Sequence, residues 1–143
     1  MCLFSARLST HSCDMNPSNR LITLAAGLLG FLGVALGAFG AHALKATLLA
    51  NGQLESWKTA VLYQMIHAVA LLALANNPNA SAGSNTKVAS CWVIGIVLFS
   101  GSLYWLALGG PIKFLWPFTP LGGVALLAGW SLLVFSSWKR PSA

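Results

Sequence analysis

Polar side chains that could do chemistry gather in one apolar stretch of this chain. Thr59, Tyr63 and His67 recur at every fourth position, so they lie on one face of a helix, and Gln64 lies beside them. Histidine is the side chain whose charge changes most readily near neutral pH, so His67 is a candidate to titrate or to bind a ligand. The alternative is a hydrogen-bonded group that fixes how the helix packs. We call these four residues the polar stripe.

Two further ionisable residues precede the polar stripe. His42 closes a glycine-rich apolar run and is expected to be an interfacial or capping residue that could approach Glu55 or Lys58. Glu55 is expected near a helix N-terminus, where the helix dipole favours a carboxylate. With the polar stripe they complete a candidate functional cluster: His42, Glu55, Thr59, Tyr63, Gln64 and His67.

The residue types do not predict an enzyme. Two histidines and one glutamate are the minimum for a catalytic zinc site, but His42 and His67 should differ in depth by roughly 15 Å of helix. No serine has a plausible base and acid partner, and a lone glutamate in this region cannot form a carboxylate pair. We therefore expect no metal, no cofactor and no catalytic residue.

The segments around these residues are apolar enough to lie in a membrane. The chain is 57% hydrophobic and 7% charged, whereas soluble domains carry about 25% charged residues. Its net charge of +6 comes without a basic run, so nucleic-acid binding is not expected. About 20 apolar residues cross a bilayer, and within lipid a helix satisfies its own backbone groups. We predict an all-α integral membrane protein, a four-helix transmembrane bundle in one domain over residues 18–140, with spans at about 20–43, 56–75, 88–108 and 118–138.

The segments outside the spans are short and polar. Residues 44–55 are predicted to form a short amphipathic turn in the interface, ended by Asn51 and Gly52. Residues 76–87 are predicted to be a flexible loop. Residues 1–17 are predicted to be a polar tail, and Met15 is a natural start for a membrane protein, so translation could begin there.

Basic and aromatic residues suggest an orientation. Lysine and arginine favour cytoplasmic loops, which slightly favours both termini inside: one side would hold Arg7, Arg20, Lys87, Lys139 and Arg140, and the other Lys45, Lys58 and Lys113. Indole rings prefer membrane interfaces, so these positions are expected for Trp57, Trp116 and Trp138, and likewise for Trp92 and Trp105 beside the third span.

Small residues follow one face of the first span. They allow a second helix to approach closely, so they predict tight helix packing at Gly30, Gly33, Gly37, Gly40 and Ala41. The alternative is a hinge or a thin wall that faces a substrate.

Two separate strings resemble a known family. Leu36-Gly-Ala-Phe-Gly-Ala-His42-Ala-Leu-Lys45 and Thr59-Ala-Val-Leu-Tyr63-Gln-Met-Ile-His67-Ala are similar to motifs of the DUF 423 family of small four-helix membrane proteins (YgdD/YwdK-like). The lead-in with Glu55, the run Gly101-Ser-Leu-Tyr104 and the entry Pro-x-x-Pro-Leu-Gly-Gly123 are also similar, so the resemblance covers about residues 18–138. It implies an inner-membrane protein of four helices with no established activity.

Two functions remain open at this point. The first is a non-enzymatic accessory or organising protein of the inner (plasma) membrane, with the lipid bilayer and either another membrane protein or further copies of the chain as partners. The alternative is a small oligomeric permease or channel with a polar path centred on His67, because polar groups within a membrane often mark such paths.

Overall fold

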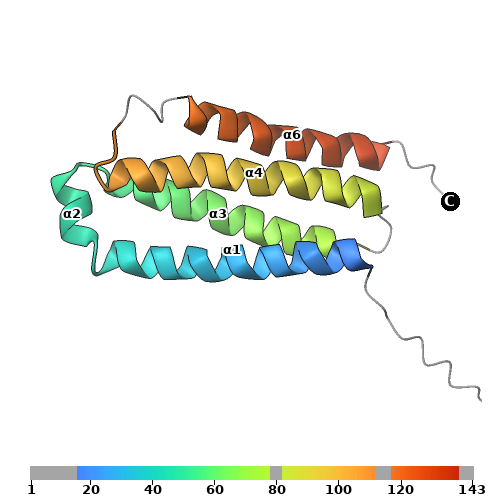
Figure 1. Ribbon diagram of the computed structural model, residues 1–143, viewed down its shortest axis with the longest axis horizontal. Helices are drawn as coiled ribbons and strands as arrows, with labels where there is room; N and C mark the ends of the chain where they lie inside the picture. Colours follow the sequence, from blue (N-terminus) through green and yellow to red (C-terminus); the bar gives the residue numbers. More distant parts are fainter. Residues whose placement is uncertain (1–15, 78–81, 112–116, 139–143) are drawn as a thin grey trace, which may run out of the picture.

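A computed structural model describes residues 16–77, 82–111 and 117–138 of the chain. Within them lie the helices α1 (Pro17–Ala41), α2 (Lys45–Ala50), α3 (Leu54–Ala75), α4 (Ala82–Ala107) and α6 (Phe118–Trp138) (Figure 1). In this described part, four helices are long and apolar enough to cross a membrane: α1, α3, α4 and α6. The predicted fold class is confirmed. Predictions that concern residues 1–15, including a start at Met15, lie outside the described residues.

Local sequence explains where the first helices begin and end. The Asn16 side chain accepts a hydrogen bond from the backbone N–H of Ser18 at 3.1 Å, and Pro17 takes the first helical position, where its missing N–H costs nothing. The helix therefore begins slightly before the predicted residue 20. The predicted turn at 44–55 contains α2, which ends before Gly52, where φ is +65° and glycine fits best.

The prediction of a loop over residues 76–87 is wrong for its second half. Helix α4 begins at Ala82 rather than at residue 88. The amide of Asn85, which is only 2% exposed, donates to the backbone oxygen of Leu74 at 3.1 Å. Asparagine favours loops through local hydrogen bonds, but this one has a partner on α3, and that contact stabilises two extra turns of helix.

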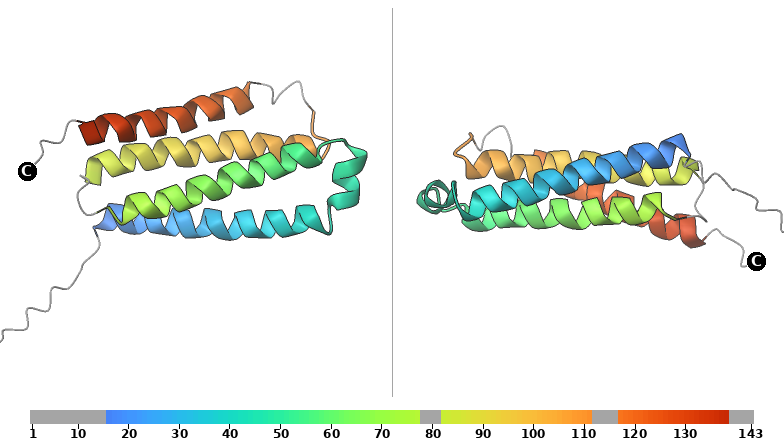
Figure 2. Two further views of the ribbon diagram at one scale, coloured as in Figure 1. Left: turned by 180° about the vertical axis from the view of Figure 1, so that it is seen from behind. Right: turned by 90° about the horizontal axis from the view of Figure 1, so that it is seen from below.

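The four long helices form an open row. They lie side by side in the order α1, α3, α4 and α6 (Figures 1 and 2), and α4–α6, α1–α3 and α3–α4 are the main packed pairs. The apolar windows of α3 and α4 are 39% buried, against 17% for α1 and α6. Helices α3 and α4 are thus central, and α1 and α6 are edges with a broad exposed face.

Helices α4 and α6 pack through alternating large and small residues. Their antiparallel register has four layers, spaced by three and four residues: Trp92 with Gly129, Gly95 with Leu126, Phe99 with Gly122, and Ser102 with Thr119. A Cβ on Gly122 would overlap the backbone of Phe99, so the two helix backbones approach closely there. This spacing is typical of knobs-into-holes packing.

The far end of the molecule is closed by α2. Figure 1 shows α2 at the end opposite to the start of α1 and the end of α6. Leu48 of α2 is fully buried, and Asn51 Nδ2 donates to the backbone oxygen of Ala107 at 3.0 Å. These contacts hold α2 across the ends of α3 and α4.

Candidate functional site

Two side chains of α3 bind the backbone of α1. Gln64 Nε2 donates to the carbonyl oxygen of Leu29 at 2.8 Å, and Trp57 Nε1 donates to that of Leu36 at 3.0 Å. Gln64 and Trp57 are seven residues apart, as are Leu29 and Leu36. The same contact is therefore made twice, two helical turns apart, along one antiparallel seam.

Glycines of α1 make room for these contacts. A Cβ on Gly40 would overlap the indole of Trp57, and a Cβ on Gly33 would lie 2.6 Å from Met65 Sδ. Each glycine stands four residues after a carbonyl that α3 binds. Gly37, between them, would place a Cβ 3.4 Å from Val61.

The predicted packing residues of α1 separate into two groups. Gly33, Gly37 and Gly40 face α3. Gly30 has no atom within 4 Å of its Cβ position, and Ala41 is exposed. The seam therefore continues from Gly37 to Gly40 rather than to Ala41.

Gln64 joins three helices. Its Oε1 accepts a hydrogen bond from the hydroxyl of Tyr104 on α4 at 3.0 Å, while its amide group binds α1. The Tyr104 ring stands edge-on to Trp57, with centroids 4.7 Å apart. Ser100 of α4 adds a bond of 2.9 Å to the carbonyl oxygen of Ala60. Gln64 is 4% exposed, and both ends of its amide are satisfied.

His67 links α3 to α6. Its Nδ1 lies 2.7 Å from the carbonyl oxygen of Tyr63, and its Nε2 accepts a hydrogen bond from Trp130 Nε1 at 3.1 Å. A carbonyl only accepts and an indole N–H only donates, so the two partners fit a neutral imidazole with its hydrogen on Nδ1. A second ring hydrogen would face the Trp130 N–H. His67 thus links α3 to α6 through hydrogen bonds of both ring nitrogens.

Aromatic rings surround His67. The rings of Trp92 and Trp130 each lie 6.0 Å from the imidazole and 4.8 Å from one another. The Tyr63 ring stacks on His67 and contacts Phe99, with ring centroids 6.2 Å and 4.7 Å apart, while Tyr63 as a whole remains 40% exposed.

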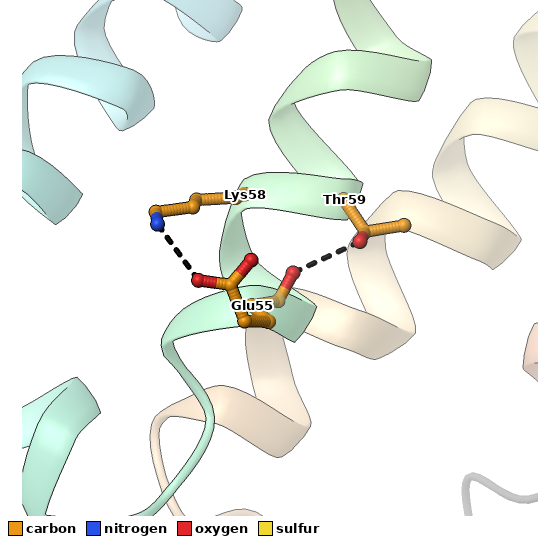
Figure 3. A network of polar contacts seen from close by, with 3 residues as sticks. All are labelled: Glu55, Lys58 and Thr59. Carbon is orange, nitrogen blue, oxygen red and sulfur yellow. Dashed lines mark hydrogen bonds and ion pairs between the residues drawn. The ribbon is translucent and has the colours of Figure 1, made fainter.

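The remaining members of the candidate cluster lie apart from Gln64 and His67. Thr59 donates to the carbonyl oxygen of Glu55 at 2.9 Å, and the Glu55 carboxylate pairs with Lys58 at 2.7 Å on an exposed surface (Figure 3). His42 is exposed at the end of α1, and its imidazole forms no hydrogen bond or ion pair within the described part of the chain.

The six residues thus form no common site. Gln64 faces α1 and α4, and His67 faces α6. Among residues 16–77, 82–111 and 117–138, no three His, Cys, Asp or Glu side chains could hold a metal ion.

Two of the tryptophans predicted at the membrane interfaces lie inside the bundle. Trp57 and Trp92 are 3% and 1% exposed, because each fills the space opposite a glycine of the neighbouring helix. Trp105 and Trp138 are exposed, and Trp116 lies outside the described residues. The sequence indicated no role for Trp130, and it singled out Tyr104 only within the run that resembles the family, although each is a polar-tipped aromatic residue within an apolar span.

Four helices that are long and apolar enough to cross a membrane, with polar side chains bonded between them, are typical of an integral membrane protein, the class to which this fold belongs. Residues 36–123 match the family model described as protein of unknown function (DUF423). The chain belongs to this family, as its two sequence motifs predict.

Curated relatives extend the match over most of the chain. A UPF0382 membrane protein of Haemophilus influenzae is 46% identical over 129 residues, which cover 87% of this chain and 98% of the relative. The UPF0382 inner membrane protein YgdD of Escherichia coli (strain K12) is 42% identical over 125 residues, covering 82% and 88%. The UPF0382 membrane protein YwdK of Bacillus subtilis is 41% identical over 110 residues, covering 76% and 88%. No solved structure matches the chain.

Proposed function

We propose that this protein is a non-enzymatic accessory or organising protein of the inner membrane that acts through its lipid-facing surface. The observation that carries the proposal is that the buried polar groups form hydrogen bonds within the protein itself. Gln64 uses both ends of its amide, and His67 uses both ring nitrogens, to join helices of the same chain. These groups serve the scaffold, which leaves the outer faces to meet partners.

The same geometry weighs against the alternative of a permease with a path centred on His67. Such a path needs polar groups that face a water-filled cavity. Two grooves of about 310 Å³ each, one between α1 and α3 and one between α1 and α4, are mainly apolar and open to the outside. Neither is lined by Gln64 or His67.

The edge helices offer the broadest surface to a partner. Phe31 and Leu24 of α1 are 72% and 60% exposed, and Leu127 and Phe135 of α6 are 67% and 64% exposed. In lipid such side chains contact acyl chains or another membrane helix. We therefore propose that a membrane-protein partner or a second copy binds to α1 or α6.

The proposal includes an orientation with both termini in the cytoplasm. Arg20 of α1 and Lys87 of α4 stand at the end of the molecule where α1 begins, and Lys45 and Lys58 at the end closed by α2. Single cysteines at residues 18 and 51, in a background without native cysteines, test this with a membrane-impermeant maleimide. Labelling of residue 51 alone from outside intact cells is expected, and labelling of residue 18 alone would reverse the orientation.

The function is tested by flux and by crosslinking. Purified protein in liposomes is expected to pass no protons, ions or small metabolites above the rate of empty liposomes. Photocrosslinkers at residues 31 and 127 in native membranes are expected to capture one defined protein or a second copy. A flux that His67→Phe abolishes would establish the permease instead.

A further inference from the structure

The groove between α1 and α3 differs from its surroundings by having a cation at its edge. It lies near α2, between the C-terminal part of α1 and the first half of α3, and is lined by Gly37, Gly40, Trp57, Val61, Met65 and Lys58 among others. The two glycines remove side chains from one wall, so the groove has a volume of about 310 Å³.

Lys58 is placed to bind an anion at this groove. Its side chain is 60% exposed, and Figure 3 shows it pointing toward the side of α1 and α2, whereas Thr59 points toward α4. Its partner Glu55 is 82% exposed, and exposed ion pairs contribute little stability. The ammonium group can therefore exchange this carboxylate for a phosphate.

The lining of the groove also favours an anion. Among the residues that line it, Lys58 is the charged one. The groove between α1 and α4 is the natural comparison: it has the same volume and is lined by Ser18, Thr86 and Ser90 among apolar residues, with no charged residue.

We propose that the α1–α3 groove binds one anionic phospholipid, with an acyl chain in the groove beside Leu62 and Met65 and the phosphate on Lys58. The inference rests on the proposed function, because it names a ligand of the lipid-facing surface. It concerns the leaflet that borders α2, and it predicts one preferred lipid position rather than uniform contact with lipid.

The experiment uses phosphatidylglycerol with a photoactivatable acyl chain, present at low fraction in phosphatidylcholine liposomes that contain the full-length protein. After illumination, peptide mass spectrometry locates the attached lipid. Labelling at Val61, Leu62 and Met65 is expected to exceed labelling at Ala89 and Val93 of the α1–α4 groove several-fold. The same probe with a phosphatidylcholine headgroup is expected to show no such preference.

Three variants assign the effect to the charge and to the space. Lys58→Gln should reduce labelling of the α1–α3 groove several-fold, and Lys58→Arg should restore it. Leu62→Trp should reduce it by filling the groove, because Leu62 lines the groove and is 56% exposed. Lys87→Gln at the opposite end is the matched control, expected to match the wild type, and unchanged melting temperatures in detergent would show that the variants fold.

The result that would overturn the inference is equal labelling of the two grooves, or labelling that Lys58→Gln leaves unchanged, since either would show bulk lipid only. Such a result would leave the flux and crosslinking tests of the proposed function unaffected. Conversely, a His67-dependent flux would reject the proposed function even if this lipid binds.

Discussion

At the scale of single residues, the polar groups of α3 work as links between helices. Gln64 connects α1 to α4, and His67 connects α3 to α6. Hydrogen bonds between membrane helices contribute about 0.6 kcal/mol on average and up to about 1.7 kcal/mol. Removing one such side chain also leaves its hydrogen-bond partners unsatisfied, because the membrane interior holds no water to replace it. The loss of unfolding free energy therefore includes the cost of these unpaired partners.

Replacing Gln64 with leucine should destabilise the protein. Gln64→Leu nearly keeps the size of the side chain but leaves the Tyr104 hydroxyl without its acceptor. We therefore expect a loss of about 1–2 kcal/mol in unfolding free energy. Thermal unfolding in detergent measures it. Thr59→Val is the control and should melt like the wild type, because Thr59 bonds only to its own helix. Equal melting of both variants would contradict the role given to Gln64.

The pair of His67 and Trp130 should behave as one unit. His67→Ala and Trp130→Phe each remove the bond of 3.1 Å between α3 and α6, so the double variant should cost less than the sum of the single variants. The coupling free energy from a double-mutant cycle of melting measurements is the readout. Strict additivity would show that the two rings do not interact.

At the scale of the elements, glycine positions decide which helices can approach. Gly122 and Gly123 are neighbours on α6, yet only Gly122 faces the backbone of Phe99, whereas a Cβ on Gly123 would lie 3.9 Å from the Phe99 ring. The sequence shows both glycines, but it does not show which of them meets α4.

This difference can be tested with the smallest possible change. Gly122→Ala should push α6 away from α4 and lower the melting temperature clearly, since backbone atoms cannot move aside as a flexible side chain can. Gly123→Ala should be neutral or slightly stabilising, because alanine favours the helix by up to about 1 kcal/mol over glycine. A reversed order of the two variants would contradict the register of the α4–α6 pair.

Gly40 and Gly30 allow the same comparison on α1. Gly40→Ala places a methyl group on the indole of Trp57 and should disturb its bond to Leu36, whereas Gly30→Ala meets open space. We expect a lower melting temperature and an altered tryptophan fluorescence spectrum for Gly40→Ala alone. Similar melting of both variants would show that α1 packs on α3 by another face.

At the scale of the whole molecule, the sequence was sufficient to predict the membrane spans but not to predict how these helices pack against one another. Length and hydropathy predict a membrane helix because crossing a bilayer depends on these quantities directly. Gln64 and His67 were recognisable as polar groups in an apolar run. Their partners, Tyr104 and Trp130, lie on other helices, and a single sequence does not specify which faces meet.

The features that the sequence did not predict have the same origin. The average preference of indoles for interfaces says nothing about burial between helices, and a glycine on the facing helix gives Trp57 and Trp92 each a buried position. The start of α4 was missed because asparagine and serine are common in loops, although Asn85 has its partner on α3.

The open row of helices has a consequence for how the chain is made. Its tightest contacts are between partners close in sequence, α1 with α3 and α4 with α6. Helices α1 and α3 are both synthesised before α4 and α6, so the glycine seam between α1 and α3 can form before the second hairpin exists. Assembly can then proceed by joining two finished halves, and a chain cut between α3 and α4 should still yield one complex when both pieces are made in the same membrane.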